Sequence, residues 1–325
     1  MMRALRAEVT KLRRPLFFWL CLAGALLTVA VGFLGQRNAA DQYKWVKEMS
    51  SQSSYGKPPT ARDMGMKPGK KYDRALVRWE SDMKRMERQN MSYAQDQIDA
   101  IALARRSQHP LGAVGFAATL SASLLGGLLV LMLAGAHVGG EWSGRTIKEM
   151  FLHDGRKWRF LAVKILSVWI GAAIMLAAAA LALAVFGALT QDLVRLPGSV
   201  TWSDAWHVAA PLVGRALVVL LFFAILGTCT GVLLRSTLGS FFVALFLLFA
   251  SVIAAMAWRS QARFMPGRWL GTWMGFRFPE MVVDHFWVSG SQHATAAHAL
   301  AKMTLLALAL LAVTLVSLSR RDALT

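Results

Sequence analysis

Charged residues, and acidic ones in particular, are scarce in this sequence. Only 17% of the 325 residues are charged, and 18 acidic residues stand against 36 lysines and arginines. A soluble domain keeps roughly a quarter of its residues charged to cover its surface. The shortage therefore argues against a soluble globular protein, and the mean hydropathy of +0.44 points the same way.

Cysteine is nearly absent as well. The two cysteines, Cys21 and Cys229, both lie inside apolar blocks, so they provide neither a disulfide framework nor a metal site, and we interpret them as packing residues. Acidic and histidine side chains do gather in the segment 259–299, but their spacing matches no compact ligand motif. We expect no bound metal.

Motifs of phosphate-binding and hydrolytic enzymes are missing too. The run from Gly65 to Lys71 has the wrong glycine spacing for a phosphate-binding loop and no Ser or Thr after its lysines. Neither a nucleophile elbow, nor a zincin helix, nor a pair of carboxylates occurs. We therefore expect a non-catalytic chain that binds no cofactor directly.

Acidic residues are absent from the apolar blocks, and the few other ionisable residues there lie near block ends: His137, Lys164, Arg215 and Lys302. Side chains at such positions can reach the lipid headgroups. Ion-driven carriers usually place an ionisable residue at mid-membrane. The pattern disfavours an ion-driven carrier, so the energy for any uphill transport would come from another subunit.

What the sequence has in abundance is long apolar blocks. A helix rises 1.5 Å per residue, so about 20 apolar residues cross the roughly 30 Å hydrocarbon layer. Six blocks of this kind lie at 16–35, 111–138, 160–189, 211–234, 238–258 and 300–318. The sequence therefore predicts an all-α polytopic integral membrane protein with six transmembrane helices, the fourth and fifth within 211–258 and the sixth within 300–325.

Basic residues indicate how the spans are oriented. They cluster in the N-terminal residues 1–15 and in the connection 139–159, whereas the outer loop 190–210 carries only Arg195. By the positive-inside rule, both termini are then cytoplasmic in a cell-membrane protein. We interpret the net charge of +18 as a basic face held against anionic membrane lipids, not as a nucleic-acid surface.

Two outer segments are long enough to fold by themselves. In residues 36–110, apolar residues recur at three- and four-residue steps from about 71 to 107, with a shorter helical pattern before them around Ala39 to Met49. This predicts an external helical hairpin between the first two spans. The segment 259–299 is rich in aromatic residues, which is typical of short interfacial or re-entrant helices.

The inner connection 139–159 is longer than a simple turn requires. Ile147, Met150 and Phe151 would lie on one side of a short helix and Lys148 and Glu149 on the other. By physics alone, this pattern fits a helix lying on the membrane surface and a docking element for a cytoplasmic partner equally well.

The connection resembles the coupling-helix region of the ABC type-2 permease family, the membrane subunits of one class of ATP-binding-cassette exporters. The residues that match are Glu141, Gly144, Arg145, Thr146, Arg156, Arg159 and Lys164. The N-terminal residues 1–15 also resemble the amphipathic interfacial helix that precedes the family's first span, through Glu8, Lys11, Arg13 and Arg14. The span number and the long loop between the fifth and sixth spans are similar as well.

This resemblance implies a permease subunit that dimerises, as a homodimer or heterodimer, and couples to separate cytoplasmic ATPase subunits, which would bind the ATP and Mg. The coupling helix would dock through Glu141, Arg145, Thr146, Lys148, Glu149, Phe151 and His153. The start of the third span would be anchored by Arg156, Lys157, Arg159 and Lys164. The cargo would be an amphiphile such as a lipid, a peptide or a drug.

A second hypothesis comes from another class of protein. The chain could be a membrane-embedded scaffold or sensor whose external hairpin binds a ligand or partner without transport. The neighbouring genes discriminate between the two hypotheses. A reading frame with a phosphate-binding loop favours the permease, and a kinase or cell-wall enzyme favours the scaffold.

The predicted topology can be tested by labelling. Cysteines introduced at Ser53 and Thr325 should differ in reaction with a membrane-impermeant maleimide added from outside, because only residue 53 is predicted to be external. Equal labelling of both positions would exclude the topology with six spans.

Overall fold

The computed structural model describes residues 2–12, 15–52, 67, 69–83, 85, 105–143, 157–190, 194, 200–239, 241–242, 245–246, 250, 266–274 and 295–321. Every element in these ranges is a helix, so the all-α expectation is confirmed for this part of the chain. The elements are α1 (Met2–Lys11), α2 (Pro15–Gln52), α4 (Pro110–Ser121), α5 (Leu124–Ser143), α7 (Lys157–Thr190), α8 (Trp202–Leu234), α10 (Pro266–Met274) and α11 (Ala296–Arg321). Residues 70–83 are also helical.

Within these residues, five helices are long and apolar enough to cross a membrane. They are Pro15–Asp41, Leu124–Glu141, Lys157–Thr190, Trp202–Leu234 and Ala296–Arg320. These correspond to the first, second, third, fourth and sixth predicted spans. Three predicted segments lie mostly outside the described residues: the fifth span (238–258), the coupling segment (139–159, of which 144–156 are not described) and the outer segment 259–299. The expectations about them stay predictions.

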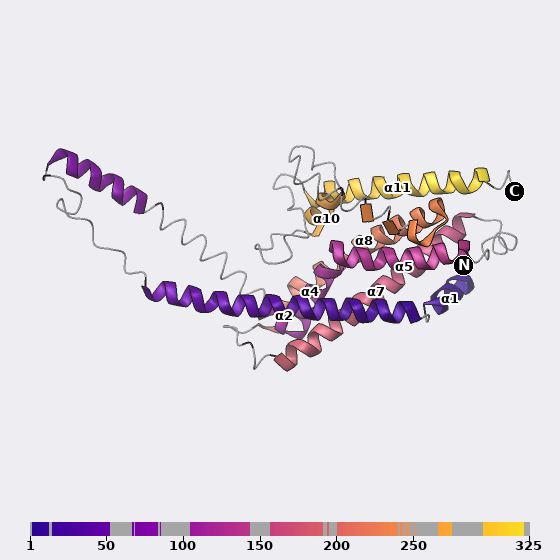
Figure 1. Cartoon of the computed structure of the whole chain (residues 1–325), viewed down its shortest axis with the longest axis horizontal. Coiled ribbons are helices and arrows are strands. Elements are labelled where there is room, and N and C mark those ends of the chain that lie inside the picture. The colour runs from indigo at the N-terminus through magenta and orange to yellow at the C-terminus, as the bar shows by residue number, and fades with distance from the viewer. Residues whose placement is uncertain are drawn as a thin grey trace.

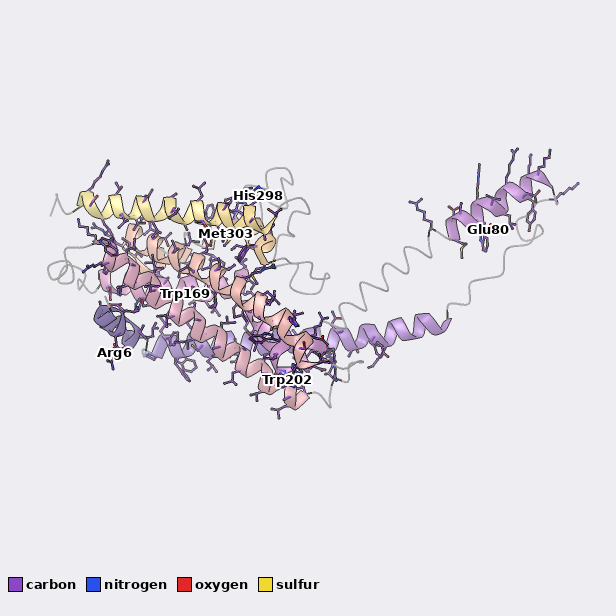
Figure 2. All side chains as sticks on the ribbon, turned by 180° about the vertical axis from the view of Figure 1, so that it is seen from behind. Arg6, Glu80, Trp169, Trp202, His298 and Met303 are labelled. Carbon is purple, nitrogen blue, oxygen red and sulfur yellow. The ribbon has the colours of Figure 1, made fainter. Side chains whose placement is uncertain are left out.

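The long helices run side by side, and both ends of the chain lie at the same end of this bundle (Figure 1). Figure 2 shows Arg6 at that end, Trp202 at the opposite end, and Glu80 on a helix well away from the bundle. The prediction that both termini share one side of the membrane stays a prediction.

The first span continues beyond its predicted end without interruption. The sequence predicted a span over 16–35 and a separate short helix around Ala39 to Met49, but α2 is one helix from Pro15 to Gln52. The residues from Gln36 to Gln52 include neither proline nor glycine, the two residue types that most often end a helix. The helix therefore carries the chain away from the bundle as a single rod (Figure 1).

The predicted second span, 111–138, is divided into two helices at Ala122 and Ser123. The backbone N–H of Ala122 still bonds to the carbonyl of Ala118 at 3.0 Å, and the Ser123 hydroxyl accepts from the N–H of Gly126 at 3.5 Å. A Cβ on Gly126 would lie 2.1 Å from the carbonyl oxygen of Ser121. Glycine is therefore required at this break, which the hydropathy of the block could not reveal.

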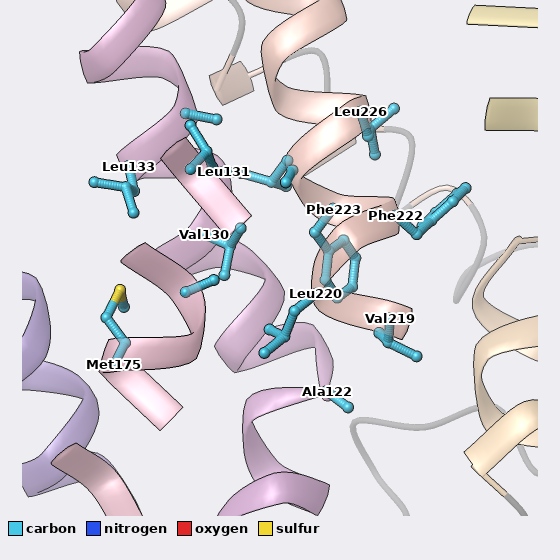
Figure 3. Packing of buried hydrophobic residues seen from close by; sticks show 14 of the residues in the cluster. Ala122, Val130, Leu131, Leu133, Met175, Val219, Leu220, Phe222, Phe223 and Leu226 are labelled. Atoms are coloured by element: carbon cyan, nitrogen blue, oxygen red, sulfur yellow. The ribbon is translucent and has the colours of Figure 1, made fainter. Parts of the chain in front are cut away.

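The core of the bundle is formed mainly by α5, α7 and α8. Phe223 and Leu220 of α8 lie against Leu131 and Val130 of α5, with Met175 of α7 close by (Figure 3). In a membrane, lipid tails are as apolar as leucine, so helices associate chiefly by close packing, which small residues allow. Large apolar side chains on the outside of the helices, such as Leu181 and Leu305, are exposed and suited to contact with lipid.

Two hydrogen bonds from buried glutamine amides join the helices at the end of the bundle opposite the termini. The buried amide of Gln36 on α2 donates to the hydroxyl of Ser107 at 3.1 Å, and the amide of Gln108 donates to the carbonyl of Val194 at 2.8 Å. These bonds hold α2 and the end of α7 to the residues that lead into α4.

Two adjacent glycines of α5 provide a matched test of the packing. A Cβ on Gly139 would come within 2.5 Å of the backbone of Thr237, whereas a Cβ on Gly140 would meet nothing within 4 Å. We expect Gly139→Ala to lower the free energy of unfolding by about 1–3 kcal/mol, because backbone cannot move aside as a side chain can. The control Gly140→Ala should be neutral or stabilise by up to about 1 kcal/mol through helix propensity.

The measurement is equilibrium unfolding of the two purified variants in detergent. Equal stability of both variants would show that α5 does not approach Thr237 this closely.

Candidate functional site

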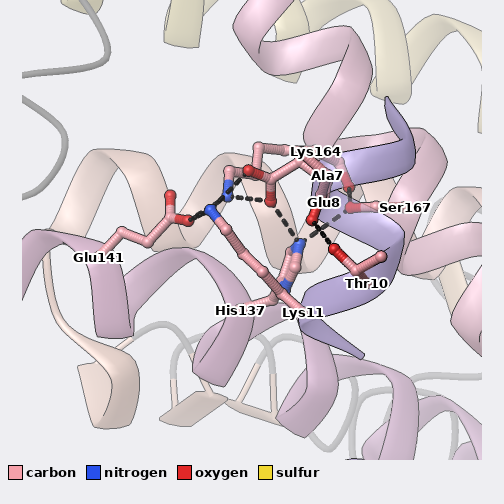
Figure 4. Close-up of polar contacts among 8 residues, drawn as sticks. All are labelled: Ala7, Glu8, Thr10, Lys11, His137, Glu141, Lys164 and Ser167. Atoms are coloured by element: carbon pink, nitrogen blue, oxygen red, sulfur yellow. Dashed lines mark hydrogen bonds and ion pairs between the residues drawn. The ribbon is translucent and has the colours of Figure 1, made fainter. Parts of the chain in front are cut away.

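A cluster of four charged side chains, three of them buried, lies at the end of the bundle that holds both termini. It brings together Glu8 and Lys11 of α1, Glu141 of α5 and Lys164 of α7 (Figure 4). Lys164 is fully buried, and Glu8 and Glu141 are 3% and 5% exposed. Buried charges of this kind are rare unless they are paired, which makes the cluster the candidate functional site.

The helix α1 brings Glu8 into the interior. Val9 of α1 and Leu12, the residue that follows the helix, pack against the core, and Leu12 approaches the position of Gly171 on α7. Glu8 lies four residues before Leu12 and therefore on the same face. An acidic residue thus sits within the apolar stripe of an otherwise basic helix, and packing of that stripe carries the carboxylate inward.

The two carboxylates and two ammonium groups alternate around a closed ring. The Lys11 Nζ lies 2.6 Å from Oε1 of Glu8 and 2.6 Å from Oε1 of Glu141. The Lys164 Nζ lies 2.5 Å from Oε2 of Glu8 and 2.5 Å from Oε1 of Glu141. Each lysine therefore bridges both glutamates, and the formal charges of the ring cancel.

His137 and Ser167 extend this ring along α5 and α7. His137 Nε2 lies 3.0 Å from Oε2 of Glu8 and 2.9 Å from the Ser167 hydroxyl, which itself donates to the carbonyl of Lys164 at 2.9 Å. Because Ser167 has one proton and gives it to that carbonyl, its oxygen accepts from His137. The Nε2 atom therefore carries a hydrogen, directed toward both Glu8 and Ser167.

These contacts decide the protonation of the two groups on α1. Burial alone raises the pKa of Glu8, but the hydrogen bond from His137, the charge of Lys164 and the hydrogen bonds from both lysines outweigh it. The pKa of Glu8 is therefore held below its ordinary value of 4.5. Burial lowers the pKa of Lys11, but the contacts with Glu141 and Glu8 outweigh it and raise this pKa above 10.5.

The signs of these two shifts define the pH range in which the ring stabilises the fold. Because the pKa of Glu8 is depressed, its carboxylate contributes stability above pH 4.5. This contribution is lost as the pH falls through the pKa that Glu8 has in the folded state. Because the pKa of Lys11 is raised, its ammonium group contributes stability below pH 10.5. This contribution is lost as the pH rises through the pKa that Lys11 has in the folded state. The contributions of Glu8 and Lys11 are therefore both present between these two limits.

The structure places the sequence-predicted site residues in three ways. Glu8, Lys11, Glu141 and Lys164, which were predicted to lie in three separate elements, come together in the ring. Lys157 donates to the carbonyl of Leu318 on α11 at 3.1 Å, and the guanidinium of Arg159 lies 5.6 Å from the centre of the Trp158 ring. The others lie outside the described residues: Arg13, Arg14, Arg145, Thr146, Lys148, Glu149, Phe151, His153 and Arg156.

One expectation about these side chains is corrected. Lys164 and His137 were expected to reach the headgroups, but they are 0% and 6% exposed and lie against the carboxylates of the ring. Glu141 was predicted to dock on an ATPase, and this docking role stays a prediction. In this chain its carboxylate is bound by two lysines.

Sequence reasoning did not assign a site role to His137 or Ser167, although a signal was present. His137 and Glu141 are four residues apart on α5, and Lys164 and Ser167 are three apart on α7, so each pair shares a helix face. Two polar pairs at these spacings, each beside the end of an apolar block, are the pattern that could have suggested a buried network.

The ion pairs of the ring join the helices α1, α5 and α7 to one another. Among the residues that the structure describes, no group of three or more His, Cys, Asp or Glu side chains could hold a metal ion. Comparisons with protein-family models, with curated proteins and with solved structures found no match. The described part of the chain therefore defines an α-helical bundle of membrane-spanning character with a buried ion ring, and function must be argued from that arrangement.

The ring can be tested by a double-mutant cycle. Glu8→Gln and Lys164→Met should each lower the free energy of unfolding by about 3–5 kcal/mol, because each leaves buried charges without their partner. The double variant should be at least about 1 kcal/mol more stable than the sum of the single effects predicts. The measurement is equilibrium unfolding in detergent at neutral pH.

The exposed pair Lys44 and Asp41, 3.7 Å apart, is the control. Asp41→Asn should change the stability by less than about 0.5 kcal/mol, because water already screens this pair. Strictly additive effects of Glu8→Gln and Lys164→Met would show that the two side chains are not coupled.

Proposed function

We propose that this chain is the membrane permease subunit of an ATP-binding-cassette exporter. It pairs with a second permease subunit and couples to separate cytoplasmic ATPase subunits, and it moves an amphiphilic substrate such as a lipid, a peptide or a drug. The proposal rests on the resemblance of the inner connection to a coupling helix and on the position of the ion ring.

The observation that carries the proposal is that the ring holds both ends of the inner connection. Glu141 lies in the last turn of α5, immediately before residues 144–156, and Lys164 lies in the second turn of α7, immediately after them. Both are bound to Lys11 or Glu8 of α1. A partner that pushes on this connection would therefore move α1, α5 and α7 together.

Such a rigid attachment suits transmission of force. A connecting segment whose ends were free would absorb a push by bending, whereas interfaces that are packed and ion-paired shift as units. The formal charges are already balanced inside the ring. The push then passes into the long α7, which spans Lys157–Thr190 and contacts α2, α4 and α8.

An ion-driven carrier is the mechanism that buried charges could otherwise indicate. However, Lys164 lies seven residues from the start of α7, about 10 Å along a helix that continues for a further 26 residues to Thr190. The ring is thus near one end of the span, not at the midplane where coupling ions bind in carriers. Its position favours energy supplied from the cytoplasm.

The alternative is a scaffold or sensor that recognises a ligand outside the membrane. It is favoured by α2, which continues as one helix to Gln52, and by the helix 70–83, which stands apart from the bundle (Figure 2). A stalk and a distant helix suit recognition, but they are equally compatible with a permease that carries an external extension.

The docking segment provides a test that separates contact with a protein from contact with lipid. We expect Glu149→Lys to strengthen attachment to anionic lipid by roughly 1 kcal/mol and to weaken docking on an ATPase, where it opposes matched charges. Glu141 is left unchanged because it belongs to the ring. The matched control is Asp322→Lys, which adds the same charge to the predicted cytoplasmic tail.

The measurement is co-purification of a chain with a phosphate-binding loop, together with ATP turnover of the purified material. The chain alone is expected to hydrolyse no ATP. Normal expression of Glu149→Lys with loss of the co-purified ATPase supports the permease. Full retention of the ATPase in both variants rejects docking through this residue, and the absence of any co-purified ATPase from the unchanged protein favours the scaffold or sensor.

A further inference from the structure

Four basic side chains mark the ends of apolar stretches on two neighbouring helices. Arg215 of α8 is separated from Arg235, the residue that follows this helix, by 19 uncharged residues, a helical length of about 30 Å. On α11, Lys302 is separated from Arg320 by 17 uncharged residues, about 27 Å. Both lengths match the hydrocarbon thickness of roughly 30 Å. Arg215 and Lys302 therefore lie at one membrane surface, and Arg235 and Arg320 lie at the other.

The short helix α10 connects Arg215 and Lys302. The indole N–H of Trp273 donates to the backbone carbonyl of Arg215 at 3.1 Å, and the guanidinium of Arg215 donates to the carbonyl of Met274 at 3.2 Å. The Lys302 Nζ lies 5.8 Å from the centre of the Trp269 ring. Because Trp269 and Trp273 are four residues apart, they occupy one face of α10, and Arg215 and Lys302 both adjoin that face.

The position of α10 fits the interface between lipid and water. Leu270 and Met274 are buried against the core, whereas both tryptophans are half-buried and pack against its edge. Tryptophan is enriched at the level of the headgroups because its ring is apolar and its N–H is polar. The helix α10 thus lies at the same depth in the membrane as Arg215 and Lys302.

The guanidinium of Arg215 has capacity for a further anion. It carries five N–H donors in a fixed fork, and its one bond to Met274 leaves most of them unused by that contact. No carboxylate among the described residues forms an ion pair with Arg215. The side chain is only half-buried, so a ligand can reach it. A planar fork of donors matches the oxygens of a phosphate group.

The surface beside Lys302 indicates that a phosphate group bound here would belong to a lipid. Leu305 and Leu308 follow Lys302 at three-residue steps along α11 and are 70% and 58% exposed. An apolar strip that begins at a cation and runs toward the opposite membrane surface is suited to an acyl chain below its headgroup. A free phosphate ion would make no use of that strip.

We propose that Arg215 and Lys302, which both adjoin the face of α10 that carries Trp269 and Trp273, form a binding site for the phosphate of an anionic phospholipid. The headgroup lies against α10 and accepts hydrogen bonds from the guanidinium and the ammonium group, and an acyl chain follows the exposed leucines of α11. The site lies at the opposite end of the bundle from the ion ring. It does not depend on the exporter proposal, because it requires only that the chain spans a membrane.

The test is retention of lipid by the purified full-length chain. Native mass spectrometry in detergent would be used to titrate the chain with phosphatidylglycerol, with phosphatidylcholine and with inorganic phosphate. We expect Arg215→Gln and Lys302→Gln each to weaken phosphatidylglycerol binding by about tenfold or more, because each removes charge-assisted hydrogen bonds. The affinity of the Arg215→Gln/Lys302→Gln double variant for phosphatidylglycerol should fall to the affinity that the unchanged chain has for phosphatidylcholine.

The matched controls are Arg235→Gln and Arg320→Gln, which remove the same charge from the opposite ends of α8 and α11. They should leave phosphatidylglycerol binding within about twofold, since each lies about 27–30 Å from the site along its helix. Arg215→Lys keeps the charge but not the fork, and intermediate binding is expected. This variant also keeps the test valid if Arg215→Gln does not fold.

Three results would overturn the proposal. Unchanged binding in the double variant would show that the site is elsewhere, and an equal loss in the control variants would show a general effect of surface charge. Competition by inorganic phosphate as strong as that by phosphatidylglycerol would identify a site for a free anion instead of a lipid.

Discussion

Three buried charges and one half-buried charge, paired within hydrogen-bonding distance, constrain the whole end of this bundle that holds the termini. A single carboxylate or ammonium group at the position of Glu8 or Lys164 would be expelled or neutralised, because transfer out of water costs far more than helix packing returns. The cost is offset only when α1, α5 and α7 are all in place, since each lysine bridges glutamates from two helices. The ring therefore favours the docking of α1 against both α5 and α7.

The same requirement explains why α1 can stay attached although it is short. A helix of ten residues is marginal by itself and buries few apolar side chains. Leu12 contributes packing, but Glu8 and Lys11 contribute the specificity, because only one register of α1 places both of them against Glu141 and Lys164. Charge matching thus defines the position of a helix that hydrophobic packing alone would hold loosely.

The two ends of the bundle use basic residues in different ways. At the end with the termini, Lys11 and Lys164 are matched by carboxylates of this chain, so the charges are satisfied internally and serve to join helices. At the other end, Arg215 is half-buried and bonds to a backbone carbonyl, which leaves donors for a group outside the protein. The first arrangement suits a mechanical connection, and the second suits recognition of an anion at the membrane surface.

The sequence by itself determined the class of structure. Apolar blocks of about 20 residues with few charges can form little other than membrane-spanning helices, because the bilayer leaves no other way to satisfy the backbone. The all-helical architecture and most of the span positions followed from hydropathy alone. The amphipathic character of residues 1–15 and the resemblance that drew attention to Glu8, Glu141 and Lys164 were also readable from the residues.

Only the tertiary structure decided how those residues meet. Hydropathy averages over a window, so it could not detect the break at Ala122 and Ser123, which depends on the missing Cβ of Gly126. Nor could it tell whether Lys164 turns toward lipid headgroups or toward the interior, because that depends on carboxylates that lie 156 and 23 residues away in the sequence. Charge position is local information, whereas charge pairing between helices is created by the packing that brings them together.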